Sequence, residues 1–168
     1  MLTRPEKTFT ELGTKAIEQG LADPVLSSFY DCFMSAQSGE QHLRLKPFLP
    51  FLSLCSDKMP SHVPPPIFYV GSECSQRQLF GDDWASPSAT AAALTTPDHD
   101  LEQASTAGYR TALLGKPYYG YARTSVTIDN NVIDIAFERL IVAVRPSIQS
   151  NYRFCAYFGV IQDFQRRL

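Results

Sequence analysis

The sequence has no uninterrupted apolar run of the roughly 20 residues that a membrane-crossing helix requires. It also lacks the positively charged start and apolar stretch that direct a chain to secretion. Charge is sparse, because only 19% of the residues are charged, the net charge is −2, and Arg166-Arg167 is the only pair of adjacent basic residues. A nucleic-acid-binding surface needs a broad basic patch. We therefore expect a cytoplasmic protein that binds neither membrane nor nucleic acid.

The sequence also lacks the spacing of a metal site. The four cysteines contain no Cys-x-x-Cys pair, and they are Cys32, Cys55, Cys74 and Cys155. His42 and His62 show no ligand spacing, and His99 lies between two aspartates where a solvated helix start is expected rather than a haem ligand. Cys74 has no Asn-Cys-Arg-type surroundings of a flavin-reactive thiol. These patterns predict reduced, mostly buried thiols, no metal, and no identifiable cofactor.

Residues 118–161 form the most regular part of the chain and predict three consecutive β-strands. Side chains alternate along the first strand, and Asp129-Asn130-Asn131 then provides a tight turn, because Asp and Asn tolerate positive φ. In the second strand the apolar parity switches after Glu138-Arg139. Either a β-bulge there restores the pattern, or the strand beyond that point is apolar on both faces.

The upstream chain supplies helices and two short strands. Residues 5–18 predict a first helix, and Asp23-Pro24 is a strong start signal for a second helix that reaches residue 37. Residues 51–55 and 67–70 predict short strands, and 72–80 a short helix. Thr96-Pro97 then predicts the start of the longest central helix, which ends at Gly115.

The two early strands must pair with the late three to hide their edges. The expected fold is therefore α+β: a five-stranded antiparallel sheet with helices on one face and an N-terminal helical extension. We expect residues 1–40 to form that extension and residues 41–168 to form the main domain.

Five short motifs follow one another along the chain, and they are Leu49-Pro50, Phe68 to Gly71, Phe80-Gly81, Tyr109-Arg110 and Gly115 to Pro117. Their order and spacing resemble a PAS-type domain, in particular the small PAS-like proteins of alphaproteobacteria. The resemblance covers about residues 22–161, whereas the proline-rich loop and the first helix depart from the pattern. It implies a bacterial signalling or sensory module with a small cavity between sheet and helices.

Residues expected to line such a cavity are Trp84, Leu101, Tyr109, Phe137, Leu140, Phe154 and Phe158. A filled hydrophobic core explains the same residues. Arg110, Arg123 and Arg139 are the basic groups near the sheet, and they can either hold an anionic ligand or, as we prefer, pair with Glu102 and Glu138 on the surface.

The outer face of the sheet, expected to carry Tyr119, Tyr121, Ile141 and Tyr157, would be too apolar if bare. The helix at 24–37 can cover it, from the same chain or from a second copy. The residues of such a homodimer interface would be Leu26, Phe29, Tyr30, Phe33, Tyr121 and Tyr157.

These features favour a stand-alone sensory or regulatory module that binds a small ligand or a signalling partner and has no catalysis of its own. The alternative is a small isomerase or hydratase on a cone-shaped α+β fold. That alternative needs an acid–base pair inside the cavity, and the inward-facing positions are expected to carry no ionisable group.

Overall fold

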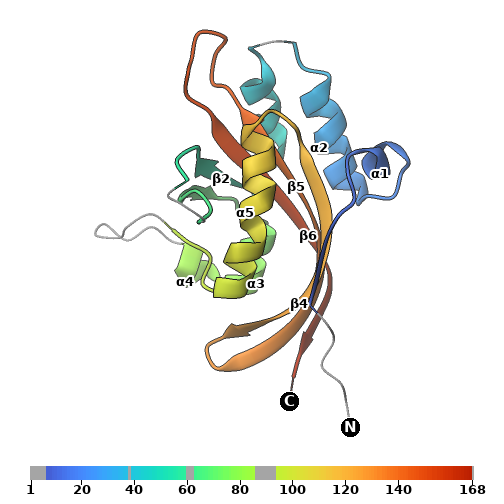
Figure 1. The fold of residues 1–168 in the computed structure, drawn as a ribbon, viewed down its shortest axis with the longest axis vertical. Helices are drawn as coiled ribbons and strands as arrows, with labels where there is room; N and C mark the ends of the chain where they lie inside the picture. Colours follow the sequence, from blue (N-terminus) through green and yellow to red (C-terminus); the bar gives the residue numbers. More distant parts are fainter. Residues whose placement is uncertain (1–6, 38, 60–62, 86–93, 168) are drawn as a thin grey trace.

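The computed structural model describes residues 7–37, 39–59, 63–85 and 94–167. Figure 1 shows a long curved sheet with helices packed on both sides of its upper part. The elements in chain order are β1 (Thr8–Glu11), α1 (Lys15–Glu18), α2 (Pro24–Met34), the 3₁₀ helix η1 (Gln41–Phe51), β2 (Leu52–Ser56), β3 (Ile67–Val70), α3 (Ser75–Phe80), α4 (Asp82–Ala85), α5 (His99–Leu113), β4 (Tyr118–Ile128), β5 (Asn131–Val144) and β6 (Phe154–Arg166).

The sheet is antiparallel and has six strands in the order β1-β4-β5-β6-β2-β3. The predicted three-stranded meander is confirmed, and the two early strands pair beside its last strand. The predicted helix over residues 5–18 is wrong for most of its length. Its described part contains β1, which pairs with β4 from Thr8↔Arg123 to Glu11↔Gly120, followed by the single turn of α1. The expected five-stranded sheet therefore gains a sixth strand.

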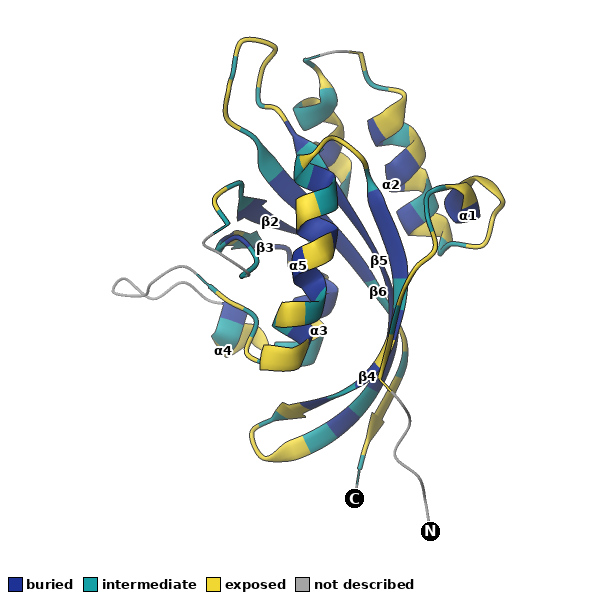
Figure 2. Cartoon of the chain, in the orientation of Figure 1, coloured by how far each residue is buried: buried dark blue, intermediate teal, exposed yellow. Residues whose placement is uncertain are grey.

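Helices cover both faces of the sheet, so the expectation of helices on one face is corrected. On one face, α2 and η1 pack against Tyr119, Leu140 and Val142. On the other face, α3, α4 and α5 pack against Tyr118, Ile141 and Tyr157. Figure 2 shows the strands buried between these two layers and more exposed at the β4–β5 turn.

The parity switch in β5 arises because helices cover both faces of the sheet only in the part away from the β4–β5 turn. The register between β4 and β5 is unbroken from Tyr118↔Ile141 to Ile128↔Asn131, so β5 has no bulge at Glu138-Arg139. In the half of β5 next to the β4–β5 turn, Ile133 and Ile135 are buried, while Val132 and Asp134 on the other face are only half-buried. In the other half of β5 helices cover both faces. The strand is therefore apolar on both faces there, which is the second of the two predicted alternatives. The irregularity lies in β6, where Ile161 and Asp163 pair with consecutive residues of β5.

The predicted start of α2 is confirmed. Asp23 precedes the helix, and its carboxylate accepts hydrogen bonds from the backbone N–H groups of Val25 and Leu26. The start of α5 is corrected from Pro97 to His99. Asp98 is the capping residue there, since its carboxylate accepts from the Leu101 N–H at 2.9 Å.

Candidate functional site

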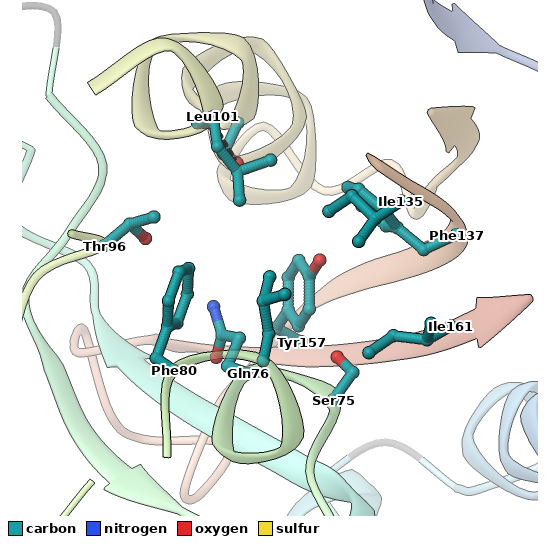
Figure 3. Close-up of a pocket in the computed structure, with 11 residues that line it drawn as sticks. Ser75, Gln76, Phe80, Thr96, Leu101, Ile135, Phe137, Tyr157 and Ile161 are labelled. Carbon is teal, nitrogen blue, oxygen red and sulfur yellow. Dashed lines mark hydrogen bonds between the residues drawn. The ribbon is translucent and has the colours of Figure 1, made fainter. Parts of the chain in front are cut away.

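A small pocket lies between α3, α5 and the lower half of the sheet (Figure 3). Its volume is about 20 Å³, which is enough for about one water molecule. The half-buried lining residues, through which it meets solvent, are Leu79, Phe80, Thr96 and Ile161. The buried lining residues are Ser75, Gln76, Leu101, Ser105, Ile135, Phe137 and Tyr157.

The polar groups of this lining are four hydroxyls and one amide, each of which can donate as well as accept a hydrogen bond. The Gln76 carbonyl oxygen accepts from the Cys74 thiol at 3.8 Å, which leaves its amide N–H groups for the pocket. In Figure 3 the Tyr157 hydroxyl stands in the middle of the lining residues, between α3 and α5. Burial raises the pKa of Tyr157 to about 12, so its hydroxyl keeps its proton at neutral pH. No Asp, Glu, His, Lys or Cys occurs in the lining formed by the described residues.

Arg139 lies behind the pocket, 1% exposed. Its guanidinium donates to the Ser105 hydroxyl at 2.9 Å and to the Ala104 carbonyl at 3.2 Å, and its positive charge lowers the pKa of Tyr157 against the larger effect of burial. Ser105 and Tyr157 line the pocket, so they connect the buried charge to it. The expected surface ion pair for Arg139 is wrong. Its Nε has no partner, and no described carboxylate forms a salt bridge with it.

The backbone around Arg139 leaves room for this side chain. Arg139 pairs with Gly120 on β4 and with Gly159 on β6, so a glycine flanks it on each side. A Cβ on Gly159 would lie 2.4 Å from the Ser75 Oγ, and one on Gly120 would lie 2.8 Å from the Tyr118 hydroxyl. Both glycines are therefore required for the close packing of the side chains that surround the guanidinium.

Aromatic rings complete the surroundings of the guanidinium. Its carbon lies 5.7 Å from the ring centres of Tyr118 and Phe137 and 5.9 Å from that of Phe9. Ring faces attract a cation and offset part of the cost of removing it from water. Such contacts leave the net positive charge in place.

Glu138, the neighbour of Arg139, is buried on the opposite face at 2% exposed. Its carboxylate accepts from the Asp23 N–H at 2.6 Å, from the Gln162 amide at 2.6 Å, and from the Tyr119 hydroxyl at 3.2 Å. It thereby fixes the start of α2 to the sheet. Burial raises the pKa of Glu138, and the nearby Asp23 carboxylate raises it further against the lowering effect of these hydrogen bonds. The expectation that no ionisable group faces inward is wrong on both faces.

The seven residues predicted to line one cavity lie in different parts of the structure. Leu101 and Phe137 line the pocket, whereas Trp84 packs on Phe80 at the end of α3. Tyr109 lies in the same layer but outside the lining, where its hydroxyl accepts from the Cys55 thiol at 3.5 Å. The other three lie on the α2 face, and these are Leu140, Phe154 and Phe158.

The predicted interface residues are mostly buried within the chain. Leu26 and Phe29 are fully buried, Phe33 is 3% exposed, and Tyr30 packs in the same cluster. The helix at 24–37 therefore covers the sheet from within the chain. Tyr157 faces α3 and α5 with Ile141, on the face opposite to Tyr119 and Tyr121, so the predicted grouping of these four residues is wrong.

Sequence reasoning missed Ser75, Gln76, Ser105 and the buried position of Arg139. One signal was available: both strands that flank Arg139 carry a Tyr-x-Gly motif, at residues 118–120 and 157–159. Alternation places the tyrosine and the glycine of each motif on one face. Two glycines that flank one arginine on neighbouring strands leave space on that face, so they indicate that the arginine side chain lies across the sheet.

The predicted buried thiols are confirmed for three cysteines. Cys55, Cys74 and Cys155 are fully buried and free, and burial raises the pKa of Cys55 and of Cys155 to about 12. His99 is exposed at the start of α5. In the described part of the chain, no cluster of His, Cys, Asp and Glu has the grouping of a metal site, and none of the helices is long and apolar enough to cross a membrane.

Comparisons with protein-family models, with curated proteins and with solved structures give no match. The chain is therefore described by its own architecture, an α+β protein with one antiparallel sheet of six strands and helices packed against it.

Proposed function

We propose that the chain is a PAS-like sensory or regulatory module that binds a small ligand in the pocket between α3, α5 and the sheet. The observation that carries the proposal is the group of donors at the pocket, from Gln76, Tyr157 and the buried Arg139 behind them. Polar groups are costly in an apolar core unless they are satisfied, so donors that converge on a cavity favour a binding site. The pairing of the two early strands beside the last one supports the PAS-like interpretation.

The size of the pocket suggests how ligand binding is transmitted to the surface of the protein. A cavity of about 20 Å³ has no room for a larger organic ligand unless a wall moves. The movable wall is α3, which has only six residues and ends at Gly81. A ligand that binds the open arrangement more tightly shifts the population toward it, and the displaced helix then presents a new surface to a signalling partner or a second copy.

The arrangement supports binding more than catalysis. An isomerase or hydratase needs a general acid and a general base that reach the same substrate. Glu138 and Arg139 are the two charged side chains buried in the described part of the chain, and they project to opposite faces of the sheet. Nothing in the pocket lining of the described residues titrates near neutral pH.

The proposal is tested by filling the pocket. Ile161→Phe adds bulk at the mouth, whereas Val160→Phe places the same aromatic side chain on the opposite face of β6 as a control. We expect small molecules that co-purify with the wild-type protein, or that raise its melting temperature in a screen, to be lost from Ile161→Phe and kept by Val160→Phe. Native mass spectrometry and thermal shift provide the readouts. Binding that persists unchanged in Ile161→Phe would place the ligand elsewhere.

A further inference from the structure

We propose that the pocket binds a compact oxyanion, namely a small carboxylate or the carboxylate group of a slightly larger molecule. This inference rests on the proposed binding function and specifies its ligand. The key observation is Arg139, a charged side chain that is 1% exposed, has an unpartnered Nε, and forms hydrogen bonds only to neutral groups.

The charge balance of this layer favours an anion. A buried charge is costly unless an opposite charge accompanies it. No described carboxylate forms an ion pair with Arg139, and Glu138 faces the other side of the sheet. The ring faces of Phe9, Tyr118 and Phe137 reduce the cost without neutralising the charge. A bound anion in the adjacent pocket would supply the missing opposite charge.

Hydrogen bonding points to the same class of ligand. The Tyr157 hydroxyl stands among the lining residues and keeps its proton at neutral pH, because burial raises its pKa, so it can donate to a molecule in the pocket. The Gln76 amide offers a second donor, because its carbonyl is already used by Cys74. The Ser105 hydroxyl, by contrast, has no proton left to donate, since it donates to the Leu101 carbonyl at 2.9 Å while its oxygen accepts from Arg139. A carboxylate accepts hydrogen bonds through both oxygens and donates none, so it matches these donors.

The cavity volume sets the size of the anion. About 20 Å³ holds about one water molecule, so even formate or acetate enters only with the movement of α3 proposed above, and a large dicarboxylate would need a much larger displacement. Formamide is the neutral counterpart of formate, with nearly the same shape. A comparison of the two therefore separates charge recognition from simple cavity filling.

The test uses the whole chain and thermal unfolding at constant ionic strength, maintained with chloride, which carries no carboxylate. We expect formate and acetate to raise the melting temperature saturably, by about 3–6 °C at a tenfold excess over Kd. Formamide should have no such effect at the same concentration. Native mass spectrometry of the same sample identifies an anion that is already bound.

Tyr157→Phe is the decisive variant, because it removes one donor and keeps the packing of the ring, whereas a change at Arg139 can prevent folding. Tyr109→Phe is the matched control, since its ring lies 6.4 Å from that of Tyr157 but outside the pocket lining. The response to formate should be lost in Tyr157→Phe and kept in Tyr109→Phe.

The two proposals fail differently. Equal responses to formate and formamide, or a full response in Tyr157→Phe, would overturn the anion site. Binding of a neutral molecule that Ile161→Phe abolishes would then leave the ligand-binding function intact. If neither charged nor neutral small molecules bind, both proposals are wrong.

Discussion

Glu138 and Arg139 are consecutive residues whose side chains are buried in different cores. Strand geometry sends neighbouring side chains to opposite faces, so the pair cannot neutralise itself. Glu138 is held by three donors at the start of α2, and Arg139 by neutral acceptors beneath α5. The hydrogen bonds of each charge therefore depend on a different helix, α2 for Glu138 and α5 for Arg139.

The raised pKa of Glu138 predicts a particular pH dependence of stability. Because the folded state holds this proton more tightly than the unfolded state, stability should fall as pH rises above 4.5 and through the folded pKa. Each unit by which folding raises the pKa costs about 1.4 kcal/mol once the group is ionised. The charged or titratable groups that face it are Asp23, Tyr119 and Tyr121, its partner on β4, and Tyr119 titrates only at high pH because burial raises its pKa.

Urea unfolding of wild type and Glu138→Gln at several pH values measures this effect. The variant should lose the downward slope above pH 4.5, whatever its absolute stability. Asp134 does not contribute to the change in stability above pH 4.5. Its pKa is lowered by hydrogen bonds from Arg167 and Ser125, so its contribution to stability is lost only as pH falls below 3.8. An unchanged slope in Glu138→Gln would show that another group causes it.

Helix α5 approaches the sheet closely at Gly108. A Cβ at this position would lie 2.9 Å from the Ile141 Cδ1 and 3.0 Å from the Tyr118 Cδ1. The glycine costs helix propensity, which alanine would restore by about 1 kcal/mol. The overpacking is expected to cost more than that gain, because inserted methyl groups in packed cores typically cost about 1–3 kcal/mol.

We therefore expect Gly108→Ala to lower the free energy of unfolding by up to about 2 kcal/mol, measured by urea denaturation. Ala107→Leu is the control, since it adds bulk at the neighbouring exposed position of the same helix. It should change stability by less than about 0.5 kcal/mol. A stabilised Gly108→Ala would mean that α5 can move away from the sheet at little cost.

Elements with a strong local signal were predictable from the sequence. The carboxylate of Asp23 caps α2 as the Asp-Pro pair indicates, and the turn at Asp129 and Asn130 adopts positive φ. Local signals failed where tertiary pairing decides. Residues 8–11 form β1 because the open edge of β4 provides backbone partners for them, which no helix propensity reveals.

The candidate site was predictable only in part. Leu101 and Phe137 follow from the apolar pattern, but the polar lining depends on how α3 meets the sheet. Arg139 was expected on the surface because charged residues are normally exposed. Its burial follows from cover on both faces of β5, and the apolar run at residues 140–144 was the local sign of that cover.

On the scale of the whole molecule, one sheet supports two cores. Side chains of α2 and of the sheet belong to the same buried cluster, so residues 24–34 contribute to the main core. The predicted division into a 1–40 extension and a 41–168 domain can be tested by the cooperativity of unfolding. An extension unfolds separately from the domain, whereas an integral layer of the core unfolds in the same transition.

Trp84 provides the probe for this question, since it is the only tryptophan and lies in α4, on the face opposite to α2. Leu26→Ala removes a fully buried side chain from α2 and should cost about 2–5 kcal/mol. If the two layers unfold together, the urea midpoint followed by Trp84 fluorescence falls as far as the midpoint followed by far-UV circular dichroism. Leu43→Ala, at a position 60% exposed in η1, is the control and should move neither midpoint appreciably. A Trp84 transition that stays at the wild-type midpoint in Leu26→Ala would show that α2 unfolds independently, as an extension would.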